Sequence, residues 1–161
     1  AKDSLESYIR SGKRPNYPDN LPAWLSEQQA GVFVSLHKHG ALRGCIGTIA
    51  PWYGCVAEEI IALAIEAGTR DPRFYPVKAD ELSELEYNVD VLSDPEPAER
   101  DQLDARRFGV IVTLGTRRGL LLPDLEGVDT PEQQISIALQ KAGIRPDENY
   151  QLERFTVERH S

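Results

Sequence analysis

Apolar and polar residues alternate along several stretches of this chain and recur with helical spacing along others. Residues 85–91 alternate strictly, which predicts a strand with one buried face and one wet face. In residues 54–67 apolar side chains recur every three or four positions, which predicts an amphipathic helix. The same criteria predict helices over residues 1–10 and 130–142, a short helical turn from residue 80, and strands over residues 31–36, 41–49, 108–114, 120–122 and 150–157.

Glycine, proline and capping residues mark the ends of these elements. Gly68 is expected to stop the helix that precedes it, and three prolines make residues 13–26 a surface loop. Thr130 can cap the helix that follows it, with proline in the first helical position. Along the last strand the apolar phase shifts between Leu152 and Phe155, which predicts a bulge or a change of the covered face.

The order of the predicted elements indicates the fold class. Strands, helix, strand, hairpin, helix and strand do not form a strict alternation of strand and helix. We therefore expect one α+β domain over residues 1–161, with a mainly antiparallel sheet and helices packed on it. No internal repeat stands out by inspection.

Composition and charge narrow the class of protein. The chain has 161 residues, 40% of them hydrophobic, and a mean hydropathy of -0.42, which excludes a disordered chain and a membrane protein. Its formal net charge of -8 argues against nucleic-acid binding. Two cysteines cannot form a disulfide framework, so we expect a reducing, cytoplasmic location.

Cys45 is the first candidate for chemistry. In a regular strand, Arg43 and Cys45 share one face, and a guanidinium beside a thiol stabilises the thiolate. Gly44 and Gly47 leave bare backbone around it, which a ligand or another segment can approach closely. The alternative is an inert core cysteine, because free cysteines are usually buried. Cys55, inside the amphipathic helix, is expected to be core.

Asp71 and Arg73 are the second candidates, in a turn fixed by the proline between them. Aspartate before proline can accept hydrogen bonds from backbone amides, and Arg73 can pair with a carboxylate or bind an anionic ligand. A rigid structural turn is the alternative. His37 and His39 have a spacing that could serve a metal, but His39 is expected at a solvated turn, and we predict neither a metal nor a cofactor.

Residues 42–47, with the sequence LRGCIG, resemble the signature of the AMMECR family, whose prokaryotic members are called AmmeMemoRadiSam system protein A. The resemblance extends over nearly the whole chain in order. It includes GVFV at 31–34, DPRFYPV at 71–77, EL at 81–82, VLS at 91–93, Pro95, GLLLP at 119–123 and KAG at 141–143. Relatives have a fuller first helix, whereas this chain begins inside a helical pattern, so we expect its N-terminal helix to be truncated.

The resemblance implies an α+β fold with a larger and a smaller subdomain, and a cleft near the signature. It places the candidate site at Arg43, Gly44, Cys45 and Gly47, then at Asp71 and Arg73. It also implies a radical-SAM protein and a Memo-type protein as partners. The chain lacks the cysteine triplet that holds an iron–sulfur cluster, so radical chemistry would belong to a partner.

Three functions remain open from the sequence. In the first, the chain is an enzyme component in which Cys45 is a reactive thiol and Arg43 and Arg73 orient an anionic group. In the second, it is a non-catalytic interaction module. There the signature is structural, through tight packing or edge pairing, and an exposed patch involves Trp52 and Tyr53. Nucleic-acid regulation is the weakest, given the charge.

Overall fold

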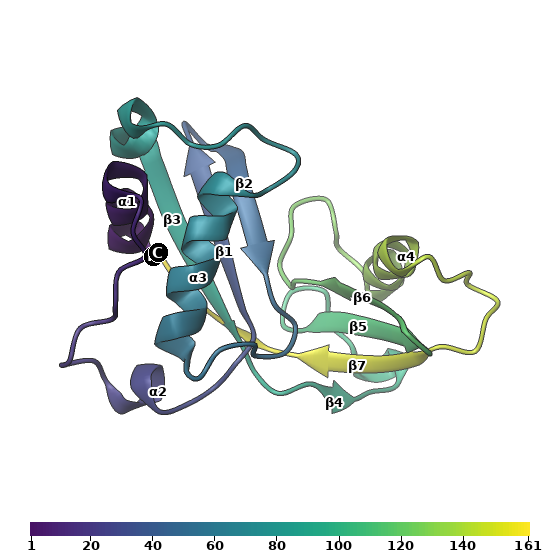
Figure 1. The fold of residues 1–161 in the computed structure, drawn as a ribbon. Coiled ribbons are helices and arrows are strands. Elements are labelled where there is room, and N and C mark those ends of the chain that lie inside the picture. The colour runs from purple at the N-terminus through teal and green to yellow at the C-terminus, as the bar shows by residue number, and fades with distance from the viewer. The chain divides into compact units, whose positions relative to one another are not determined.

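The computed structural model describes all residues from 1 to 161 and divides into two compact units. Unit 1 comprises Ala1–Val91 with Glu158–Ser161, and unit 2 comprises Leu92–Val157. Each unit has an antiparallel sheet and helices (Figure 1). The α+β class and the division into a larger and a smaller part are confirmed.

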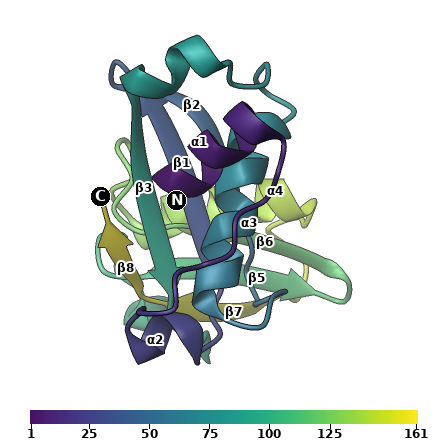
Figure 2. The same ribbon diagram turned by 60° about the vertical axis from the view of Figure 1, so that its left-hand side comes forward.

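Unit 1 is built on a four-stranded sheet with the order β2-β1-β3-β8 (Figure 2). Its strands are β1 (Val32–Lys38), β2 (Ala41–Gly47), β3 (Leu85–Leu92) and β8 (Val157–His160). Its helices are α1 (Lys2–Ser11), α2 (Ala23–Ser26), α3 (Val56–Thr69) and the 3-10 helix η1 (Ala79–Glu84). Strand β2 is an edge strand, paired only with β1.

The core of unit 1 lies between its sheet and α3. Alternate residues of β1, Val32, Val34 and Leu36, are completely buried, as period-two alternation requires. Helix α3 carries apolar residues around most of its circumference and lies across β1 and β2 (Figure 1). The side of the sheet away from α3 therefore carries the alternate residues of β1 and β2.

Unit 2 is built on a second four-stranded sheet with the order β4-β7-β5-β6. Its elements are β4 (Glu96–Pro97), the 3-10 helix η2 (Arg100–Gln102), β5 (Gly109–Leu114), β6 (Arg117–Leu121), α4 (Pro131–Ala142) and β7 (Gln151–Phe155). Helix α4 packs on β5 and β6. The Thr130 hydroxyl caps it, the predicted proline follows, and the Gln133 side chain in turn accepts a bond from the N–H of Thr130.

The two units share one topology that the sequence did not reveal. In each, a hairpin is followed by a helix and then by a strand that pairs with the first strand of the hairpin: β1-β2-α3-β3 and β5-β6-α4-β7. The second hairpin strand is the edge strand in both, and a fourth short strand lies beyond β3 or β7. The two halves can therefore be compared position by position.

Several predicted boundaries differ from the structure. Gly68 does not stop the preceding helix, because it lies inside α3, where a Cβ atom would come within 2.5 Å of the side chain of Leu5. Here glycine serves close packing and the helix continues to Thr69. The predicted last strand breaks at Thr156, where the chain leaves β7 and enters β8 of the other sheet. Helix α2 and strand β4 were missed because they are too short to show a period.

Candidate functional site

Cys45 lies on the edge strand β2, on the side of the sheet away from α3. Its neighbour Gly44 faces α3, so strand alternation turns the thiol to the opposite side. Directly across from Cys45 on β1 is Ser35, whose hydroxyl donates a 3.3 Å hydrogen bond to Sγ of Cys45. Cys45 is partly exposed, whereas Cys55, at the start of α3, is buried with 3% exposure.

The turn after α3 holds both main-chain polar groups of Cys45. Its N–H donates to Oδ2 of Asp71 at 2.9 Å, and its carbonyl accepts from Nη2 of Arg73 at 3.3 Å. On an edge strand such outward-facing groups have no strand partner. Asp71 and Arg73 therefore take the place of a neighbouring strand at this residue, and they bring the two candidates of the turn to the thiol-bearing strand.

Asp71 is an anchored carboxylate with 4% exposure. Besides the N–H of Cys45, it accepts three bonds from Arg73: from N and Nε at 3.0 Å each and from Nη2 at 2.8 Å. The Arg73 guanidinium beside Asp71 holds the pKa of this carboxyl far below its usual range, and burial opposes the shift without cancelling it. A carboxylate so firmly ionised fits positioning better than proton transfer.

Arg73 is the exposed member of this pair. Its side chain is 56% exposed, and its Nη1 makes no hydrogen bond within the protein. The bond to Asp71 is the main cause that raises the pKa of Arg73, and the negative charge of a Cys45 thiolate adds to the rise. Its hydrogen bond to the Cys45 carbonyl places the guanidinium beside the residue that carries the thiol.

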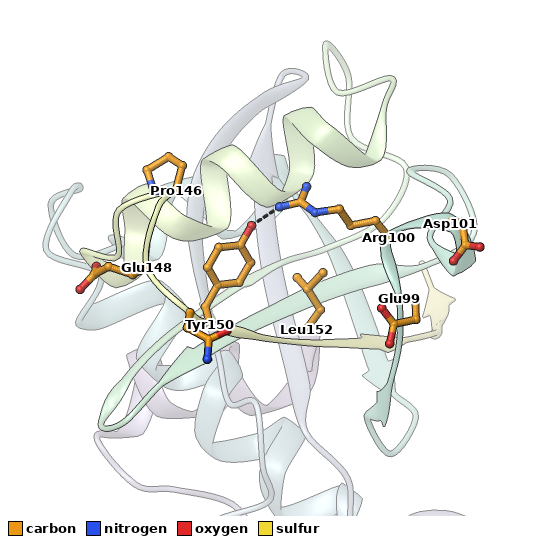
Figure 3. A pocket seen from close by; sticks show the side chains of 8 residues that line it. Glu99, Arg100, Asp101, Pro146, Glu148, Tyr150 and Leu152 are labelled. Carbon is orange, nitrogen blue, oxygen red and sulfur yellow. Dashed lines mark hydrogen bonds between the residues drawn. The ribbon is translucent and has the colours of Figure 1, made fainter.

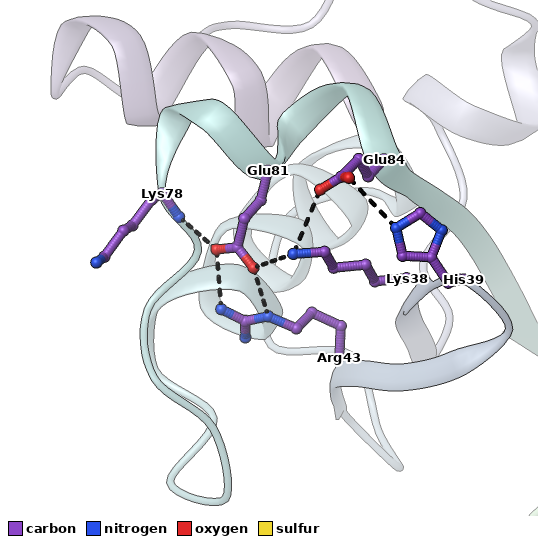
Figure 4. A network of polar contacts seen from close by, with 6 residues as sticks. All are labelled: Lys38, His39, Arg43, Lys78, Glu81 and Glu84. Atoms are coloured by element: carbon purple, nitrogen blue, oxygen red, sulfur yellow. Dashed lines mark hydrogen bonds and ion pairs between the residues drawn. The ribbon is translucent and has the colours of Figure 1, made fainter.

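Arg43 points into a different set of contacts (Figure 4). Its Nε and Nη2 donate to the two carboxylate oxygens of Glu81 at 3.1 and 3.2 Å, and its side chain is only 15% exposed. Lys38 and the N–H of Lys78 donate to the same carboxylate. These contacts, with the Arg43 guanidinium first, lower the pKa of Glu81 to about 2. The network ties the β1–β2 hairpin to η1, and a catalytic role of Arg43 stays a prediction.

The two glycines beside Cys45 are approached closely by the protein itself. A Cβ atom on Gly44 would lie 2.2 Å from the carbonyl oxygen of Ala67 in α3. A Cβ atom on Gly47 would lie 2.3 Å from the ring of Phe33. These contacts explain both glycines by packing, and a ligand-binding role for either one stays a prediction.

Ser35 and Asn88 are polar neighbours of Cys45 that the sequence analysis missed. Strand register places Ser35 of β1 between Cys45 on one side and Asn88 of β3 on the other, so the three form a row across the sheet. All three are partly exposed. Only the pairing register could have identified this row, because Ser35 and Asn88 stand far from Cys45 in the sequence.

The role of Glu59, which holds the loop after β2 in place, was also missed. It is completely buried in the first turns of α3 and accepts a 2.7 Å bond from the hydroxyl of Thr48. Its two oxygens also accept from the N–H groups of Trp52 and Tyr53. The loop is thus fixed from inside while the side chain of Trp52 is 82% exposed and Tyr53 is partly exposed.

The other features of the structure do not involve Cys45. A pocket of about 510 Å³ in unit 2 is lined by Arg100 and Tyr150, among others, and the Arg100 guanidinium donates to the Tyr150 hydroxyl (Figure 3). None of the predicted site residues lines it. No group of three or more histidine, cysteine, aspartate or glutamate side chains could hold a metal ion. No helix has both the length and the apolar character needed to cross a membrane.

Comparison with known proteins places the chain in a family. Residues 1–160 match the model of the AMMECR1 family. A Clostridium acetobutylicum protein is 52% identical over 99% of this chain, which spans only 34% of that protein. A Thermotoga maritima protein is 52% identical over 97% of this chain and 91% of its own length.

A solved structure agrees with this placement. The crystal structure of an uncharacterized protein from Pyrococcus horikoshii matches with a TM-score of 0.89 and 36% identity, covering 98% of this chain and 85% of the other. Sequence and structure comparisons thus agree over almost the full length. The chain belongs to the AMMECR1 family.

Proposed function

We propose that this chain is the A component of an AmmeMemoRadiSam system and contributes a reactive thiol, Cys45, to that system's chemistry. The observation that carries the proposal is the arrangement around this one residue. Ser35 donates to its sulfur, and Asp71 and Arg73 hold its N–H and its carbonyl. Fixing a partly exposed thiol from three directions suits a group that must meet a substrate in one orientation.

The chemistry expected of this arrangement is nucleophilic. Thiolate is the reactive form of cysteine, and it is stabilised by hydrogen-bond donors and nearby cations. Ser35 supplies a donor and Arg73 supplies the cation, whereas Asp71 holds Arg73 and the strand in place. The thiol must be reduced to act, as in the cytoplasm, and both cysteines are free.

Partner proteins are part of this proposal. The Clostridium relative carries this domain within a chain about three times as long, so a related domain works while joined to further polypeptide. We propose that the corresponding polypeptides, joined to the domain or separate from it, are its partners. The family resemblance suggests a radical-SAM protein and a Memo-type protein, which would supply the radical or metal chemistry.

A non-catalytic interaction module is the second candidate function, favoured by the exposed Trp52. A buried carboxylate holds its loop in place, and a rigidly presented tryptophan is a common anchor of protein interfaces. Edge pairing along β2, by contrast, is blocked at Cys45 by Asp71 and Arg73. In this function the partner would contact the Trp52 loop, and Cys45 would have no chemical role.

Alkylation of the native protein separates the two functions. Iodoacetamide at pH 7, followed by peptide mass spectrometry, should label Cys45 in the folded protein faster than Cys45 in the urea-unfolded chain, with Cys55 as the buried control. Ser35→Ala should slow the labelling about 3- to 10-fold, because one hydrogen bond to the thiolate is lost. Trp52→Ala should leave the rate unchanged. Labelling of Cys45 only after unfolding would contradict the thiol function and leave the interaction module.

A further inference from the structure

We infer that the Cys45 site acts on electrophiles that carry a carboxylate or a similar anionic group, which Arg73 binds through its free Nη1 edge. The inference rests on the proposed thiol function and specifies its substrate class. It gives the anion-binding role to Arg73 alone, because Arg43 is engaged with both oxygens of Glu81.

Arg73 is oriented for this task by the residues behind it. Two of its nitrogens, Nε and Nη2, are fixed by Asp71 at 3.0 and 2.8 Å, and Nη2 also donates to the carbonyl of Cys45. The guanidinium plane is therefore tied to the residue that bears the thiol. A guanidinium has five N–H donors, and the two on Nη1 remain available on an exposed side chain.

Burial decides which charge of the ion pair faces solvent. Asp71 is 4% exposed, whereas the Arg73 side chain is 56% exposed, so an approaching ligand meets the guanidinium. The chain as a whole carries a net charge of -8 and does not attract anions from a distance. A preference for anionic reagents must then come from direct contact with Arg73. Added salt should weaken this contact less than it would weaken long-range electrostatic attraction.

The equivalent position in unit 2 shows how the carbonyl of an edge strand is capped beside an apolar side chain. There Lys141 donates to the carbonyl of Leu120 on edge strand β6, and the Leu120 side chain is apolar and 5% exposed. Capping the carbonyl therefore does not require arginine. In unit 1 the capped residue carries a thiol, and the cap is an arginine with donors left over.

The reaction that this site would perform is a substitution at carbon. The Cys45 thiol first loses its proton to solvent, and the sulfur lone pair then forms a C–S bond while the leaving group departs with its bonding electrons. Arg73 holds the substrate's anionic group so that the electrophilic carbon faces sulfur. Iodoacetate is the simplest probe, since iodide leaves and the carboxylate is one bond away from the attacked carbon.

The test compares iodoacetate with the neutral iodoacetamide on the intact chain. The ratio of their rates at Cys45 should be about 5- to 10-fold higher in the folded protein than in the urea-unfolded chain. Arg73→Gln should return the ratio to the unfolded value. Arg70→Gln, an equal change of charge at an exposed arginine of the same turn, should leave the ratio as in the wild type.

A competition experiment avoids any effect of substitution on folding. Acetate added to the wild-type protein should slow labelling of Cys45 by iodoacetate more than labelling by iodoacetamide. An equal effect on both reagents, or a rate ratio equal to that of the unfolded chain, would overturn the anionic-substrate inference while leaving the thiol function intact. Absence of labelling by either reagent in the folded protein would instead overturn the thiol function itself.

Discussion

Strands β2 and β6 hold the same place in their sheets, yet they present different side chains beside the same kind of glycine. Gly44 of β2 packs against the carbonyl oxygen of Ala67 in α3, and Gly119 of β6 packs against that of Ala138 in α4. A Cβ atom would lie within 2.2 Å of that oxygen in unit 1 and within 2.1 Å in unit 2. The glycine in each edge strand thus allows the helix to lie close to the sheet.

Two further features recur in both units. The fourth residue of each helix is polar and completely buried: Glu59 in α3 and Gln134 in α4. Each one bonds main-chain groups of a loop outside its helix. The carbonyl after each edge glycine accepts a bond from a basic side chain, Arg73 in unit 1 and Lys141 in unit 2.

The units differ in the residue that follows the edge-strand glycine and in its partner on the neighbouring strand. Unit 2 has Leu120 opposite Ile111, both buried and apolar. Unit 1 has Cys45 opposite Ser35, both partly exposed, with Asp71 on the N–H. Features that both units have are explained by the shared architecture, and the close packing of Gly44 is one of them. The Cys45 thiol, the Ser35 hydroxyl and Asp71 are not required by that architecture, which makes them the functional candidates.

Adding a methyl group to either edge glycine should give the largest effect. Gly44→Ala and Gly119→Ala force the strand away from its helix, because the contact is with backbone that cannot rotate aside. Each should lower the free energy of unfolding by about 4 kcal/mol, measured by urea titration. Gly54→Ala is the control, since its Cβ would meet only the end of the Glu58 side chain at 3.2 Å. A cost below about 1 kcal/mol at either edge glycine would refute their shared role.

Substituting either of the two buried polar residues should have the next largest effect on stability. Glu59→Gln replaces an acceptor of several N–H and O–H groups by an amide with one oxygen, leaving donors unpaired. Gln134→Glu places a carboxylate against the carbonyls of Ala105 and Phe108. Each should cost about 2–4 kcal/mol in a urea titration. If neither substitution lowered the stability, Glu59 would not be needed as an acceptor nor Gln134 as a donor.

The ion pairs of the two units should differ in strength and in pH dependence. The pKa of Glu81 is lowered to about 2, so its stabilisation is present above the ordinary value of 4.5 and is lost as the pH falls through about 2. Glu81→Gln should therefore cost about 2 kcal/mol at pH 7, and the difference from wild type should shrink between pH 4.5 and 2.

The matched pair in unit 2 provides the control for Glu81. Arg118 precedes Gly119 as Arg43 precedes Gly44, and it pairs with Glu153 at 3.6 Å, with side chains that are 38% and 29% exposed. Glu153→Gln should change the free energy of unfolding at pH 7 by no more than about 0.5 kcal/mol. Equal costs for the two substitutions, or a Glu81→Gln cost that does not vary with pH, would contradict the greater strength of the Glu81 ion pairs.

The sequence predicted elements wherever the determinants are local. Strict alternation over residues 85–91 and the cap at Thr130 are read within a few positions, and both correspond to observed elements. Gly68 misled the prediction because its role depends on Leu5, which belongs to another helix. The common topology of the two units was invisible, since strand pairing rather than sequence similarity defines it.

The candidate site was predictable in part. Cys45, Asp71 and Arg73 were selected from local chemistry, and hydrogen bonds join them in the structure. Arg43 was selected because it shares a strand face with Cys45, but a long side chain can reach elsewhere, and it reaches Glu81. Ser35 was missed because finding it requires the strand register. Spacing along one strand identifies a face, whereas partners on other strands come from the tertiary fold.

Removing one hydroxyl from β3 should have the smallest effect, and it makes unit 1 resemble unit 2. Tyr87 pairs with Leu36 across the sheet as Leu152 pairs with Val112, but its hydroxyl is buried without a hydrogen-bond partner in the protein. Burial raises the pKa of Tyr87 to about 12, so stability is expected to fall as the pH rises from 10 towards 12.

Tyr87→Phe should leave the free energy of unfolding unchanged at pH 7 or raise it by up to about 1 kcal/mol, because no bond is lost and a polar atom leaves the core. The same variant should lose the decline in stability between pH 10 and 12, which urea titrations at pH 7, 10 and 11 would detect. A loss of more than about 1 kcal/mol at pH 7 would mean that the hydroxyl has a partner after all, such as a buried water. Strand β3, which holds the same place in its sheet as β7, would then differ from β7 in its hydrogen bonding as well.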